Sequence, residues 1–183
     1  MILYLKIASI NGQKPFPLHD MNKRSTFIDQ KKESLFQERG YILVDSFLSN
    51  DEVSFLKKAY LDTPNDLGVG FHATTHSRDI DYRRFVTKII AKVFHHKASE
   101  LLYNFRPIVG TFTVKETGQE SFFDFHLDWS MIDESKAHSI TIWVTLEDTK
   151  EENGNLWILD KSIHHGDSYR CSPGLHMLVE DDK

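Results

Sequence analysis

Hydrophobic residues recur at helical spacing in three segments of the N-terminal half of the chain. These segments are residues 25–39, 48–63 and 81–100, and each places its apolar side chains on one face of a helix. Ser25 or Thr26 can cap the first helix, and acidic residues open the second as the helix dipole prefers. The pattern therefore predicts three amphipathic helices.

The pattern changes to short runs rich in β-branched and aromatic residues after residue 104. The predicted strands there are residues 105–115, 122–129, 138–147 and 155–160, and one further short strand is predicted earlier, over 41–47. Asn153-Gly154 is a hairpin signal between the last two. This alternation predicts an α+β, mainly β, protein: a helical part over 25–104 packs on a β part over 105–183 that forms a sandwich or barrel.

The first 24 residues fit this scheme less well. MILYLKIASI is apolar but only ten residues long, contains Lys6, and is followed by Pro15 and Pro17. It matches neither a membrane-spanning helix nor a signal peptide. We expect 1–24 to be a loosely ordered lead-in, 25–183 to be a single domain, and the protein to be cytoplasmic without a membrane partner.

Composition and charge narrow the class further. Hydrophobic residues make up 40% and charged residues 27% of the 183 residues, which is typical of a globular protein. The net charge of −5 argues against a nucleic-acid partner, because such surfaces are usually basic. The single cysteine, Cys171, excludes an internal disulfide framework.

The segment FHLDWS contains the candidate chemistry. On a strand, His126 and Asp128 point to the same side about 7 Å apart, so they can supply two members of the 2-His-1-carboxylate set that binds non-haem Fe(II). The alternative is a strand-end pair that makes local hydrogen bonds. His165 and Asp167 share the spacing but lie in a turn-rich segment, and we set them aside.

Several motifs in order resemble the phytanoyl-CoA dioxygenase family of Fe(II)/2-oxoglutarate oxygenases. They are GYILVDSFLSNDEVSFL, VGTFTVK, HLDWSMIDE and SITIWVTLEDTKEENGNLWIL. The resemblance implies a double-stranded β-helix, a jelly roll with cupin-like architecture. It also implies that His126 and Asp128 hold Fe(II), that 2-oxoglutarate is the cosubstrate, and that a small organic molecule is hydroxylated.

The resemblance suggests two further residues for the cosubstrate site. Trp143 is similar to a family aromatic on the neighbouring strand, and Lys115 is a candidate partner for a 2-oxoglutarate carboxylate. A core aromatic and a solvated strand-end lysine are the corresponding structural interpretations.

The sequence departs from the family pattern near its end. The family uses a downstream histidine as third ligand and an arginine beyond it; here only His176 is a substitute ligand, and no arginine follows it. We expect a fragment truncated before its last strands, with weak or no activity and an exposed sheet edge that favours a homo-oligomer. The alternatives are a complete protein that has lost catalysis and serves as a non-catalytic metal- or small-molecule-binding module, and a zinc hydrolase, which lacks a second motif at zinc spacing.

Overall fold

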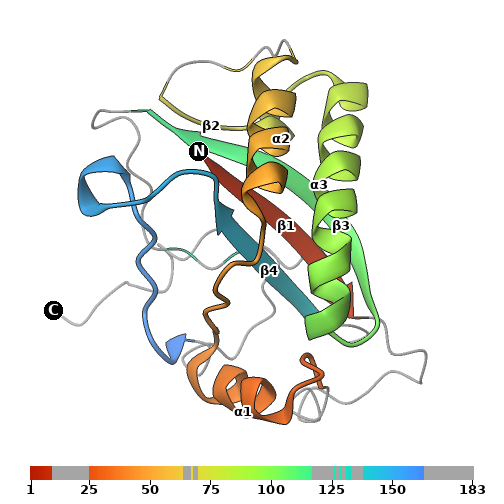
Figure 1. Cartoon of the computed structure of the whole chain (residues 1–183), viewed down its shortest axis with the longest axis vertical. Coiled ribbons are helices and arrows are strands. Elements are labelled where there is room, and N and C mark those ends of the chain that lie inside the picture. Colours follow the sequence, from red (N-terminus) through yellow and green to blue (C-terminus); the bar gives the residue numbers. More distant parts are fainter. Residues whose placement is uncertain are drawn as a thin grey trace, which may run out of the picture.

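A computed structural model describes residues 1–9, 25–63, 67, 70–116, 126, 128, 131–132 and 138–162 of the chain. The helices are α1 (Gln30–Arg39), α2 (Asn50–Leu61) and α3 (Ile80–Leu101), with short 3-10 turns η2 (Thr74–His76) and η4 (Glu151–Asn153). The strands are β1 (Ile2–Ser9), β2 (Phe71–Ala73), β3 (Phe105–Lys115) and β4 (His138–Thr145). These residues form a mixed α+β structure (Figure 1).

The four strands form one antiparallel sheet in the order β2-β3-β1-β4. The first strand of the chain is thus an inner strand: Leu5 lies opposite Gly110 of β3 on one side and Ile142 of β4 on the other. Leu5 and Ile7 are each only 1% exposed and belong to the main hydrophobic core.

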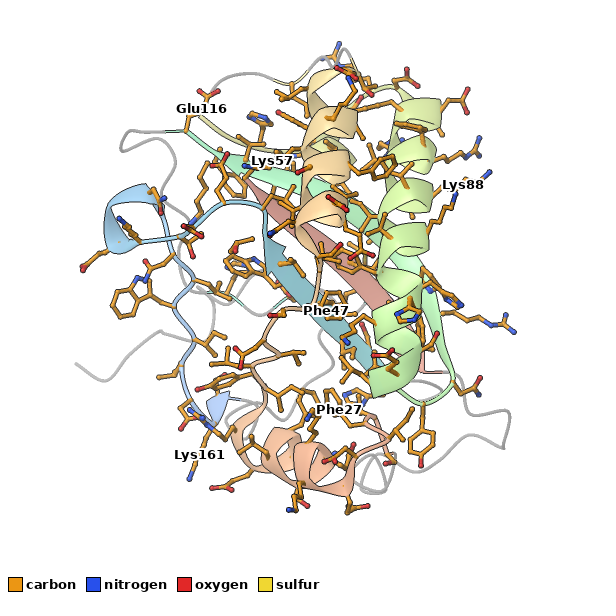
Figure 2. The ribbon with its side chains drawn as sticks, in the orientation of Figure 1. Phe27, Phe47, Lys57, Lys88, Glu116 and Lys161 are labelled. Carbon is orange, nitrogen blue, oxygen red and sulfur yellow. The ribbon has the colours of Figure 1, made fainter. Side chains whose placement is uncertain are left out.

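Helices α2 and α3 lie side by side over one face of this sheet (Figure 1). The buried residues of α3 recur every four positions, namely Tyr82, Val86, Ile90, Phe94 and Ala98. A Cβ added to Gly110 would lie 3.1 Å from Cβ of Ile90, so the missing side chain lets α3 approach β3 closely. Phe47 lies in the segment before α2 (Figure 2). Its ring centroid is 5.1 Å from that of Phe94.

Side-chain caps define where the helices begin. Ser49 and Glu52 form a complete capping box at α2, and Asp79 accepts hydrogen bonds from two backbone N–H groups of α3. The helices predicted over 48–63 and 81–100 are therefore confirmed as α2 and α3, with ends that agree to within two residues. Helix α1 begins later than predicted, because Asp29 caps it instead of Ser25 or Thr26.

The expected loosely ordered lead-in is wrong for its first part. Residues 2–9 form β1, whose alternating apolar side chains complete the core, while residues 10–24 lie outside the described residues. Most of the short apolar run, which matches neither a membrane-spanning helix nor a signal peptide, thus forms an inner strand of the sheet. None of the described helices is long and apolar enough to cross a membrane.

Two predicted strands are not strands. In residues 41–47, Ile42 and Phe47 pack on the core while Leu43 is 82% exposed, and none of the described strands pairs with this run. Residues 155–160 are also irregular, and four consecutive large side chains there are exposed, namely Leu156, Trp157, Ile158 and Leu159. Gly154 adopts the expected left-handed turn, but no hairpin follows it.

The expected jelly roll needs two facing sheets. The described part of the chain contains a single sheet. Of the predicted strand over 122–129, only His126 and Asp128 are described, and neither has strand geometry. The α+β class is confirmed, whereas the double-stranded β-helix is not seen as such.

Candidate metal centre

The candidate site lies against the sheet face opposite Leu5 and Ile7. Side chains alternate along β1, so Lys6 points away from the helix-covered core. Thr141 of β4 is the direct cross-strand partner of Lys6. The register of β1 and β4 therefore places an ammonium and a hydroxyl side by side.

His126 and Asp128 converge next to this pair. Nε2 of His126 lies 3.5 Å from Oδ1 of Asp128, and both side chains are about one-third exposed, at 35% and 33%. The other carboxylate oxygen, Oδ2, accepts a 2.7 Å hydrogen bond from Oγ1 of Thr141. The two oxygens of Asp128 thus face different partners, and Oδ1 is the one that faces the imidazole.

Asp128 is held in its charged form. Burial by itself would raise the pKa of this carboxyl, but the hydrogen bonds from His126 and Thr141 and the charges of Lys6 and His126 outweigh burial. The net result lowers the pKa of Asp128 below its ordinary value of 3.8. A carboxylate ionised well below neutral pH is the state that a metal ligand requires.

This lowered pKa predicts a specific loss of stability in acid. The unfolded chain binds a proton at Asp128 more readily than the folded chain does, so the stabilisation is complete above about pH 5 and fades as the pH falls through 4 and below. We expect the difference in free energy of unfolding between the wild type and Asp128→Asn to shrink over this range. Urea titrations at pH 7, 5, 4 and 3 would measure it, and a constant difference would contradict the assignment.

The distance between the two donor atoms fits a shared metal ion. Donors bound at about 2.1 Å to one ion lie roughly 3.0 Å apart at a right angle and roughly 3.4 Å apart at a tetrahedral angle. The observed 3.5 Å is close to this range. An imidazole nitrogen with a carboxylate oxygen also suits Fe(II). Among the described residues, no group of three or more His, Cys, Asp or Glu side chains is arranged to hold a metal.

The other predicted site residues lie in different places. Alternation along β4 places Trp143 on the same face as Thr141, half-buried. Lys115 lies six residues along β3 from Val109, the cross-strand partner of Lys6, which is roughly 20 Å of strand. The side chain of Lys115 lies beside Gly154. His176, His165, Asp167 and Cys171 lie outside the described residues.

Sequence reasoning did not identify Lys6 and Thr141 as parts of the site. The signal for Lys6 was present, since a single charge inside MILYLKIASI marks a position that cannot join the apolar core. Thr141 gave no signal, because a threonine in SITIWVTL is ordinary for a strand.

A paired imidazole and carboxylate beside a β-sheet is typical of mononuclear non-haem metal proteins. The family model described as Phytanoyl-CoA dioxygenase (PhyH) matches residues 36–174. The chain therefore belongs to the phytanoyl-CoA dioxygenase family, and membership implies an Fe(II)- and 2-oxoglutarate-dependent dioxygenase. No curated protein and no solved structure matches the chain.

Proposed function

We propose that the chain binds Fe(II) through His126 and Asp128 and belongs to the hydroxylases that act on a small organic substrate with 2-oxoglutarate. The observation that supports this most is the 3.5 Å approach of Nε2 of His126 to Oδ1 of an ionised Asp128. When bound, Fe(II) supplies oxygen activation coupled to oxidation of 2-oxoglutarate.

The protein itself contributes orientation and charge. His126 offers the imidazole nitrogen Nε2, Asp128 offers one carboxylate oxygen, and Thr141 occupies the other oxygen. Trp143, two residues along β4 from Thr141, can shield the same face from water.

Metal titration tests this assignment. Co(II), which accepts the same ligands as Fe(II) and resists oxidation in air, should bind the wild type at one site. We expect Asp128→Ala and His126→Ala each to weaken binding by more than about 100-fold, because even loss of an outer partner costs about 10- to 100-fold.

A matched control measures adventitious surface binding. His96 and Glu100 are exposed on α3 with 3.6 Å between Nδ1 and Oε1, so they form a similar pair without the sheet environment. His96→Ala should leave Co(II) affinity unchanged. If His96→Ala weakened binding as much as Asp128→Ala does, the proposed centre would be wrong.

Turnover separates an active oxygenase from a non-catalytic binding module. With His126 and Asp128 as the assigned ligands, we expect little or no succinate from Fe(II), 2-oxoglutarate and oxygen, because a two-ligand site holds iron weakly. Stoichiometric succinate formation that disappears in His176→Ala would instead identify His176 as the third ligand. In a binding module that uses no metal, Asp128→Ala would leave ligand affinity unchanged.

A further inference from the structure

We propose that Thr141 and Lys6 are positioning residues that aim Asp128 at the metal, so that the N-terminal strand forms part of the candidate centre. This inference rests on the proposed function, since it assigns a role toward the same metal. It adds a further chain segment, residues 2–9, to a site otherwise built from His126, Asp128 and residues 138–145.

Lys6 is unusual because its side chain is fully buried. It is among the largest fully buried side chains of the described residues, although lysine normally extends its ammonium into water. Its Nζ lies 3.2 Å from Oγ1 of Thr141, directly across from it in the β1–β4 pairing. Sheet register therefore fixes the position of this buried cation.

The ammonium determines how the Thr141 hydroxyl is used. An ammonium can only donate hydrogen bonds, so toward Lys6 the hydroxyl oxygen must accept. The single hydroxyl proton of Thr141 is then directed to Oδ2 of Asp128, at 2.7 Å. A carboxylate anchored at Oδ2 keeps Oδ1 turned toward Nε2 of His126, which is the arrangement a shared ion needs.

The cation also acts in the opposite sense, because its charge repels a metal ion bound nearby. A single Lys6 variant would mix the two effects. A double-mutant cycle separates them, since removing Lys6 removes the same charge whether or not the Thr141 hydroxyl is present.

The experiment measures Co(II) affinity in four full-length proteins: wild type, Thr141→Val, Lys6→Met and the double variant. We expect Thr141→Val to weaken binding about tenfold when Lys6 is present. In the Lys6→Met background the same change should cost about threefold or less, because the hydroxyl is no longer held as a donor to Asp128. An equal loss in both backgrounds, or no loss in either, would overturn the proposal.

Two further variants distinguish positioning from a general structural effect. Thr141→Ser keeps the hydroxyl and should restore wild-type affinity. Thr145→Val removes a hydroxyl on the same face of β4 and should change nothing. If Thr145→Val weakened Co(II) binding as much as Thr141→Val, the effect would come from the strand and the proposal would fail.

The outcomes also distinguish this positioning proposal from the proposed metal site on which it rests. Co(II) binding that requires Asp128 but ignores Thr141 refutes the positioning role alone. Absence of Co(II) binding in the wild type refutes both. Thermal melts of each variant show whether it is folded, and Lys6→Met keeps the side-chain length that the buried position needs.

Discussion

A chain that lacks residues 1–9 should not fold cooperatively. Removing β1 takes out an inner strand, so β3 and β4 both lose their backbone partner along this strand. It also removes Leu5 and Ile7, each worth about 1.5 to 3 kcal/mol of burial. Together with the unpaired backbone groups, this loss is comparable with the roughly 5 to 15 kcal/mol that stabilises a typical domain.

Circular dichroism during heating and in urea would test this result. The truncated chain should show no cooperative transition, and a synthetic peptide of residues 1–9 added in excess should restore one. For a graded comparison, Leu5→Ala should cost about 2 to 5 kcal/mol, whereas Leu43→Ala, at an 82% exposed position, should cost less than about 0.5. A truncated chain that melts like the wild type would show that β1 is dispensable.

Loss of the Glu33 carboxylate should destabilise the fold by about 4 kcal/mol. Oε2 of Glu33 accepts hydrogen bonds from the backbone N–H groups of Thr26 and Phe27 at 2.7 and 2.8 Å, in a buried setting. Oε1 accepts another from the Gln37 side chain at 2.8 Å. Glu33→Ala leaves two buried backbone donors without this acceptor, at about 1 to 3 kcal/mol each, and loses the charge-assisted bonds as well.

Urea unfolding at neutral pH would measure the change. Glu38, one turn and a residue further along α1, is mostly exposed, so Glu38→Ala is the matched control and should cost less than about 0.5 kcal/mol. Glu33→Gln keeps one acceptor oxygen and should fall between the two. A loss below about 1 kcal/mol for Glu33→Ala would mean that water replaces the carboxylate, against the burial of this site.

The elements that the sequence predicted well carry their own signals. Helix α2 has a capping box and α3 has an apolar stripe at helical spacing, so local chemistry specifies both. Strands β3 and β4 are long β-branched runs, and their predicted ranges agree with the observed ones to within two residues.

The elements that were missed depend on partners far away in the chain. MILYLKIAS forms an inner strand because it pairs with both β3 and β4, which lie about 100 and 130 residues later in the chain. Residues 41–47 have strand composition but pair with none of the four described strands, so their side chains pack singly. Composition alone cannot distinguish these two cases, because pairing is decided by tertiary context.

The candidate centre likewise combines residues that the sequence predicted with residues that only the structure identifies. The spacing of His126 and Asp128 was visible in the sequence, and the structure brings their donor atoms within 3.5 Å. The contribution of Thr141 and Lys6 was hidden, since it follows from the register of β1 against β4. Lys115 was proposed from its place on a strand end, which gives no information about distance across a sheet.

The inner position of β1 also sets the order in which the protein can fold during its synthesis. Ile2 leaves the ribosome well before its partner in β4, Thr145, which is made 143 residues later. At about 5 to 20 residues per second, this separation corresponds to roughly 7 to 29 s. During that interval the apolar strand β1 lacks at least one of its two partner strands, so chaperones that bind emerging hydrophobic segments should control the yield of folded protein.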